Sequence, residues 1–198
     1  MSEGEEVLLI RHGEVEARWK KVCYGAMDVA LSERGRLASN KLAEELVKQY
    51  RPATVFHSGL SRTRYLAEQL ADRFGADVSI KEETLLRERD YGQWQGLSWD
   101  AAYQSDADHF HDLIDKPDTY RPPGGETTSE MQQRMVRWLN SLPSSDQPII
   151  AVSHSGPITA LVGYLLELPA AKWNSIMPAY LDVVRLSRRH SSARWRFV

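Results

Sequence analysis

Three short apolar stretches of this sequence are closely followed by side chains that could bind an anion or attack one. They are Arg11 and His12 after residues 7–10, Ser58 and Arg62 after residues 54–57, and His154 after residues 148–153. Short apolar runs bounded by turn residues are typical of buried strands. If these strands are parallel neighbours, their carboxyl ends bring the five side chains to one edge of a sheet.

The residue types at these strand ends match the needs of phosphoryl transfer. Arginine offers paired N–H donors to phosphate oxygens, so Arg11 and Arg62 are the candidate phosphate-binding groups. A neutral imidazole nitrogen can attack phosphorus, and His12 is the candidate nucleophile. His154 is the candidate donor of a hydrogen bond to the transferring group. The leaving oxygen needs a proton, for which Glu88 in the stretch LLRERDYGQWQG is the candidate general acid.

Each of these residues, taken singly, has a simpler interpretation. A histidine at a strand end is more often a surface residue or a satisfied core residue, and RHG alone is a weak motif. Arg62 at the start of a helix could be solvated, and Glu88 could pair with an arginine beside it. Their joint placement after strands is what favours a site.

The elements that must position these residues alternate between strands and helices. Strands are expected at 7–10, 54–57, 78–80 and 148–153, helices at 32–50, 61–75, 127–143 and from 156, and a closing hairpin at 181–186 and 194–198. This alternation predicts a three-layer α/β/α sandwich with a mainly parallel central sheet. We expect a single domain over residues 1–198, with an irregular insertion at about 87–125 over the site.

Composition narrows the possible partners and compartment. The chain has 198 residues, with 25 basic and 27 acidic side chains, so its overall charge does not indicate nucleic-acid binding. Its start is acidic and its first apolar run stops at Arg11, which is neither a signal peptide nor a membrane span. The single cysteine, Cys23, suits a reducing cytosol. A cytoplasmic protein without nucleic-acid or membrane partners is expected; its oligomeric state is left open.

One acidic segment, DADHFHDLID at 106–115, invites a metal interpretation. On a helix, residues two apart point to different faces, so His109 and His111 would not converge on one ion. A solvated helix is the better interpretation, and neither a metal nor another cofactor is expected. Five aromatic residues are candidates for the rim of the pocket or for the core: Trp19, Tyr24, Tyr91, Trp94 and Trp99.

The sequence resembles the histidine phosphatase superfamily, the phosphoglycerate mutase-like proteins. The resemblance rests on LLIRHGE at 8–14, YGAMDVALSERG at 24–35, HSGLSRTRYLA at 57–67, LLRERDYGQWQG at 85–96, PPGGET at 122–127 and VSHSG at 152–156. It implies a phosphorylated histidine at His12, phosphate-binding arginines at Arg11 and Arg62, a proton donor at Glu88 and the second histidine at His154. It also implies a small phosphorylated substrate.

The sequence departs from this family's pattern at two positions, Arg18 and Leu66, where many relatives have asparagine and threonine. Many relatives have asparagine six residues after the nucleophile, where this chain has Arg18, which becomes a candidate substrate-binding residue with Tyr24 and Gly25. The mutase branch follows its acid block with paired arginines, and residues 97–123 contain no adjacent arginines. This favours a phosphatase, and the Tyr-Gly start of the second block resembles the α-ribazole phosphatase branch.

Three functions remain open at the level of sequence. The leading one is a metal-independent phosphomonoesterase that works through a phosphohistidine on His12, with Glu88 as general acid and base. The alternatives are a phosphoglycerate mutase-type transfer and a non-catalytic module that binds phosphorylated ligands. Glu88 discriminates against the module, because a pure binder has no use for a proton donor.

Overall fold

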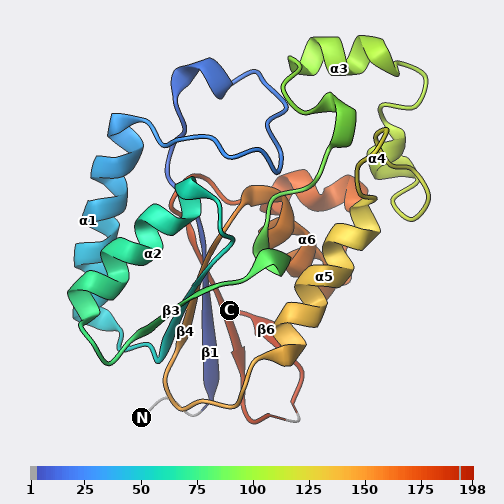
Figure 1. The fold of residues 1–198 in the computed structure, drawn as a ribbon. Coiled ribbons are helices and arrows are strands. Elements are labelled where there is room, and N and C mark those ends of the chain that lie inside the picture. Colours follow the sequence, from blue (N-terminus) through green and yellow to red (C-terminus); the bar gives the residue numbers. More distant parts are fainter. Residues whose placement is uncertain (1–3, 192) are drawn as a thin grey trace.

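The computed structural model describes residues 4–191 and 193–198 of the chain (Figure 1). Its strands are β1 (Glu5–Arg11), β2 (Thr54–His57), β3 (Ser79–Glu82), β4 (Ile149–Ser153), β5 (Val183–Arg188) and β6 (Arg196–Phe197). Its α-helices are α1 (Glu33–Gln49), α2 (Ser61–Phe74), α3 (Trp99–Ser105), α4 (Asp112–Asp115), α5 (Thr128–Ser141) and α6 (Ser155–Leu165). Short 3₁₀ helices are η1 (Ala17–Trp19), η2 (Thr84–Leu86), η3 (Gly92–Trp94) and η4 (Ala170–Ile176).

The strands form one sheet in the order β3-β2-β4-β1-β5-β6. The pairs β2–β3, β2–β4 and β1–β4 are parallel, whereas β5 and β6 are antiparallel additions at one edge. The prediction of a mainly parallel sheet with a closing hairpin is therefore confirmed.

Alternating side chains of β1 fill two separate cores. Val7 and Leu9 pack with residues of α5 and α6, while Leu8 and Ile10 pack with residues of α1 and α2. Side chains two apart in a strand point to the same face, so β1 is apolar on both faces. Figure 1 shows α1 and α2 on one side of the sheet and α5 and α6 on the other. This is the predicted three-layer sandwich.

The helices begin where side chains satisfy their first free N–H groups. The Ser32 hydroxyl accepts from the Gly35 N–H at 3.0 Å, and Thr127 forms a capping box with Glu130. Both starts agree with the sequence. No helix in the described part of the chain is long and apolar enough to cross a membrane.

Two local predictions need correction. The third strand is Ser79–Glu82 rather than 78–80, and all four of its residues are exposed, so no burial pattern marks its ends. The helix expected over 106–115 is wrong except at Asp112–Asp115. The Asp106 carboxylate binds the His109 ring and the Tyr120 hydroxyl, and such side-chain hydrogen bonds compete with a regular helix.

The segment at 87–125 contains η3, α3 and α4 and lies at the carboxyl end of the parallel strands (Figure 1). It is tied to residues 22–24 by backbone hydrogen bonds between Cys23 and both Gly96 and Leu97. Trp94 is buried against Cys23 and stacks on Phe110, with ring centroids 5.2 Å apart. Trp94 therefore belongs to the core rather than to the rim of a pocket.

Candidate active site

The parallel register brings the ends of β1 and β4 together. Arg11 lies opposite Ser153, so His12 and His154 leave the two strands side by side. Their ring centroids are 5.1 Å apart. The backbone N–H of His12 donates to the backbone carbonyl of Ser153 at 3.0 Å, which holds the two strand ends together. The end of β2 is the next neighbour of β4 and supplies Ser58. Both imidazoles are almost completely buried at this edge of the sheet.

The ring of His12 is held in one orientation by its own turn. Its Nδ1 lies 2.7 Å from the Gly13 carbonyl, which can only accept, so Nδ1 carries the proton. Burial, together with the positive charges of Arg62 and Arg11, holds the pKa of His12 well below its usual range. The ring is therefore neutral near pH 7, and its unprotonated Nε2 has the lone pair that a nucleophile requires.

His154 is held in the opposite tautomer by a chain of hydrogen bonds. Its Nδ1 accepts from Arg62 Nε–H at 3.2 Å, so its proton lies on Nε2. Nε2 then donates to Ser58 Oγ at 2.9 Å, which in turn donates to Thr63 Oγ1 at 2.8 Å. The chain ends where the Thr63 hydroxyl donates to the Leu60 carbonyl. Burial and the Arg62 charge lower the pKa of His154, which agrees with a neutral ring.

Arg62 is fully buried at the start of α2 and is fixed by backbone carbonyls. Its guanidinium donates to Met27 at 2.6 Å and to Gly25 at 2.7 Å, and lies 5.2 Å from the Tyr24 ring centroid. Gly25 has φ of +39°, and a side chain there would meet the Arg89 carbonyl at 2.6 Å. Gly25 therefore contributes by holding Arg62 through its carbonyl group.

Arg11 is positioned by a loop that no sequence motif indicated. It donates to the Pro178 carbonyl at 2.8 Å and lies over the Tyr180 ring, 4.0 Å from its centroid. The Tyr180 ring centroid is also 5.7 Å from that of His12. Reciprocal backbone hydrogen bonds hold this loop to β1, from Leu181 to Arg11 and from Arg11 to Asp182.

Glu88 follows η2, which is anchored to the end of β4 by a hydrogen bond from Ser153 Oγ to the Leu86 carbonyl at 2.7 Å. Its Oε1 accepts from the Arg89 N–H at 3.0 Å. Burial raises the pKa of Glu88, although Arg62 and Arg11 lie near enough for their charges to oppose this effect. A carboxyl group whose pKa is raised in this way can hold a proton and donate it.

Arg18 is the one candidate that the structure does not bring to this cluster. Its side chain is 71% exposed and pairs with Glu16 at 2.7 Å, while its guanidinium lies near the Trp19 ring. Tyr24 does lie beside Arg62, and burial raises the pKa of its hydroxyl, which stays protonated and able to donate. In the described part of the chain, no three His, Cys, Asp or Glu side chains are grouped to hold a metal ion.

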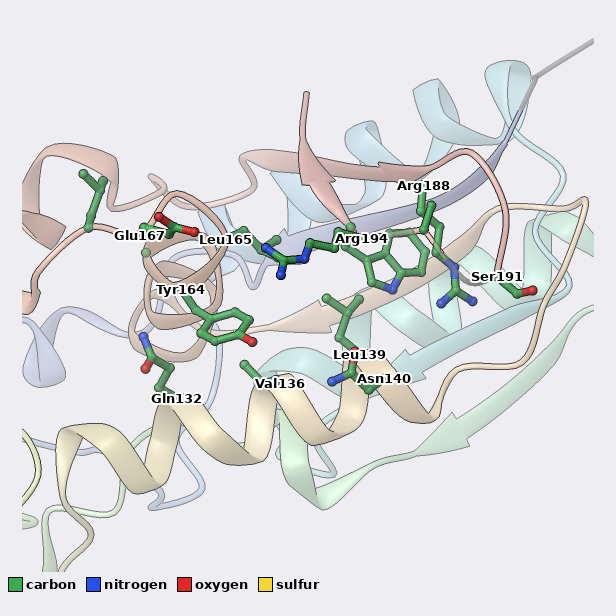
Figure 2. A pocket seen from close by; sticks show the side chains of 14 residues that line it. Gln132, Val136, Leu139, Asn140, Tyr164, Leu165, Glu167, Arg188, Ser191 and Arg194 are labelled. Carbon is green, nitrogen blue, oxygen red and sulfur yellow. The ribbon is translucent and has the colours of Figure 1, made fainter.

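A separate cavity of about 650 Å³ lies between α5, α6 and the end of the chain (Figure 2). Its lining includes Asn140, Tyr164 and Arg194, and none of the candidate site residues. Arg188, at its edge, pairs in register with Glu5 at the beginning of β1. The cavity is therefore at the opposite end of the sheet from His12.

The fold and these side chains define an enzyme class that acts on phosphate esters. Two arginines and two neutral histidines meet at the carboxyl edge of a parallel sheet, next to a carboxyl group with a raised pKa. The chain belongs to the histidine phosphatase superfamily (branch 1), whose family model matches residues 7–198.

Individual relatives include phosphatases and a probable mutase. The chain is 32% identical over 180 residues to glucosyl-3-phosphoglycerate phosphatase of Mycobacterium tuberculosis, covering 86% of this chain and 79% of the relative. It is 34% identical over 168 residues to a probable phosphoglycerate mutase GpmB of Erwinia tasmaniensis, covering 83% and 76%. It is 28% identical over 172 residues to phosphoserine phosphatase 1 of Hydrogenobacter thermophilus, covering 85% and 79%.

Solved structures agree with this assignment. Mycobacterial glucosyl-3-phosphoglycerate phosphatase in complex with VO3 matches with a TM-score of 0.78 at 32% identity, covering 98% of this chain and 96% of the other. A putative alpha-ribazole-5'-P phosphatase from Escherichia coli matches with a TM-score of 0.82 at 22% identity, covering 98% and 96%. That second likeness shows the fold alone, so α-ribazole phosphatase activity stays a prediction.

Proposed function

We propose that this chain hydrolyses phosphate monoesters of small organic molecules through a phosphohistidine on His12. The observation that carries the proposal is the 2.7 Å contact between His12 Nδ1 and the Gly13 carbonyl. A carbonyl can only accept, so the proton lies on Nδ1 and Nε2 is unprotonated. The charges of Arg62 and Arg11 act on the pKa of this ring and also on that of the Glu88 carboxyl group, so both groups lie near the same two arginines.

The proposed reaction has two steps. Nε2 of His12 bonds to phosphorus as the ester P–O bond breaks, and Glu88 transfers its proton to the leaving oxygen. Water then attacks the phosphorus, the Glu88 carboxylate accepts a proton from that water, and the N–P bond breaks to release inorganic phosphate. Arg11 and Arg62 bind the phosphoryl oxygens, and their fixed N–H groups need no rearrangement as charge develops.

The substrate is proposed at the level of class. Relatives are named for glucosyl-3-phosphoglycerate and phosphoserine, so small phosphorylated metabolites are the first compounds to test. A cytoplasmic location is part of the proposal and rests on the single cysteine, Cys23.

The test is to trap the phosphoenzyme. Brief turnover of ³²P-labelled phosphoserine or of ³²P-labelled p-nitrophenyl phosphate, stopped by denaturation, should leave a base-stable, acid-labile label on the chain. His12→Ala should lose both label and turnover, whereas His109→Ala, an exposed histidine outside the site, should keep both. A label that persists in His12→Ala would overturn the assignment of the nucleophile.

A mutase is the second candidate, because the GpmB relative is 34% identical. A mutase would return the phosphoryl group from His12 to another hydroxyl group of the substrate. Within residues 97–123 the one arginine, Arg121, pairs with Glu130 at 2.9 Å, so no arginine pair is offered to a second phosphate. ³¹P NMR of the reaction with 3-phosphoglycerate distinguishes a phosphatase from a mutase, since hydrolysis yields inorganic phosphate and the mutase reaction yields 2-phosphoglycerate.

A further inference from the structure

Four of the candidate site residues are almost completely closed off from solvent in this structure. His12 is 1% exposed and Glu88 is 9% exposed, while Arg62 and His154 have no exposed surface. A surface that a water molecule barely touches cannot admit a phosphoryl group, which is larger. Since the free nitrogen of His12 has to bond to phosphorus in the proposed reaction, part of the covering must move before a substrate can bind.

The side of the site toward the sheet cannot provide this opening. His12 and His154 directly follow β1 and β4, in which residues 8–10 and 150–153 have no exposed surface. The apolar side chains of both runs belong to the cores on the two faces of the sheet. Moving them would unpack those cores, whereas surface segments open at much lower free energy. The opening therefore lies among the loops that cover the strand ends.

One of these loops places Tyr180 over the reaction centre. The ring centroid of Tyr180 lies 5.7 Å from that of His12 and 4.0 Å from the guanidinium carbon of Arg11. The next residue, Leu181, has a φ of +66°, in the left-handed region that residues other than glycine rarely adopt. Such strain persists only where surrounding contacts impose it. The loop is therefore held in place by its contacts rather than by the preferences of its backbone.

A second loop supplies Tyr24, which meets Tyr180. The Tyr24 ring centroid lies 5.2 Å from the guanidinium carbon of Arg62, and the Tyr24 hydroxyl forms a hydrogen bond with the Tyr180 hydroxyl. The charges of Glu88 and Arg62 also act on the pKa of Tyr24, so this hydroxyl lies near both groups. Both tyrosines are partly exposed. The pair therefore lies between the buried site residues and the solvent.

We propose that Tyr24 and Tyr180 form a gate over His12, which opens when the hydrogen bond between their hydroxyls breaks and the side chains turn outward. Each side chain turns about its own single bonds, so the gate opens without unfolding either loop. The chemical steps proposed above use neither hydroxyl, and the pair controls access to the nucleophile. This inference rests on the proposed function, because it states how a phosphate ester reaches His12.

The test measures how readily a small reagent reaches His12 in the absence of substrate. Diethyl pyrocarbonate acylates neutral imidazoles, and mass spectrometry of peptides follows His12 and the exposed His109 in one sample. Tyr24→Phe and Tyr180→Phe remove the bond between the hydroxyls and keep both rings. Each should raise the acylation rate of His12 about threefold or more, as the loss of one neutral hydrogen bond warrants. Tyr180→Ala also removes a ring and should raise this rate further, while His109 should react at the same rate in every variant.

Tyr164→Phe makes the same change at an exposed tyrosine outside the site and should leave the rate at His12 unchanged. A rate at His12 that is unchanged in all three gate variants would overturn the inference, as would a His12 that reacts as fast as His109 in the unmodified protein. Acylation needs no turnover, so the phosphoenzyme test decides the proposed function separately. A label on His12 with unchanged acylation rates refutes only the gate. Absence of the label refutes the proposed function, and with it the gate as a device for substrate entry.

Discussion

Replacement of Glu88 by glutamine isolates its role as a proton donor. Glu88 is only 9% exposed, and its Oε1 accepts from the Arg89 N–H at 3.0 Å, a bond that a glutamine side-chain oxygen can retain. The variant therefore keeps the shape and the anchoring of the residue and loses the transferable proton. Its effect should depend on how strongly the leaving oxygen needs that proton.

The expected loss of rate in Glu88→Gln differs between two leaving groups. An alkyl phosphate such as phosphoserine leaves as a strongly basic alkoxide, so Glu88→Gln should slow phosphoenzyme formation by about 10²–10⁴-fold, the usual contribution of general acid catalysis. p-Nitrophenyl phosphate leaves as a weakly basic phenolate and should lose much less. Single-turnover measurements of label on the chain are required, because Glu88 also activates water in the second step.

Arg62→Lys is the control for this comparison. Arg62 binds the phosphoryl group itself in the proposed reaction, so its replacement should slow both substrates by similar factors. If Glu88→Gln slowed the two substrates equally as well, Glu88 would be positioning or binding the substrate, and the argument from its raised pKa would be refuted.

Three further predictions follow from the site and its supports. The rate of phosphoenzyme formation should fall at low pH only well below 6.5, where His12 becomes protonated, and should fall at high pH as Glu88, whose pKa is raised above 4.5, loses its proton. In Glu88→Gln the fall at high pH should disappear, and a pH profile identical to that of the unmodified protein would contradict this. The ¹⁵N chemical shifts of the imidazole nitrogens should show the proton on Nδ1 in His12 and on Nε2 in His154. The same tautomer in both rings would contradict the assigned hydrogen bonds. Arg134→Met should lower the free energy of unfolding by about 1–3 kcal/mol in urea denaturation, because it leaves the partly buried Glu126 carboxylate without its ion pair. A loss well under about 1 kcal/mol would contradict this.

Activity in excess chelator checks the remaining expectation from the sequence, since no metal is required by the proposed steps. Full turnover is expected, and activity lost to chelator and restored by a divalent ion would reopen the acidic segment at 106–115.

The central part of the fold could be predicted because its elements are buried on defined faces. The apolar run at 7–10 is buried on both faces, and the capping box at Thr127 marks the start of α5 chemically. β3 has no buried face, so its ends left no pattern in the sequence. At 106–115 the helical interpretation failed because the Asp106 side chain competes for hydrogen bonds, which periodicity does not register.

The candidate site divides along a similar line. Residues that act through their own side chains could be proposed in advance. His12 was indicated by its type and its position after a strand, and Glu88 by its type and by the family resemblance. The groups that hold the site side chains are largely backbone carbonyls. The Gly13 carbonyl holds His12, those of Gly25 and Met27 hold Arg62, and that of Pro178 holds Arg11. A carbonyl acceptor is common to every residue, so a sequence contains no sign of which one will be used.

Tyr180 is a residue beside the site that the sequence did not indicate. It lies in a loop between η4 and β5 with no motif, yet its ring contacts both Arg11 and the neighbourhood of His12. The loop reaches the site because β5 runs antiparallel to β1, so the residues just before β5 meet the residues that end β1. That consequence follows only from the pairing of β5 with β1 and from its direction. Once a hairpin is predicted to join the sheet beside the first strand, the loop that precedes it can be searched for site residues.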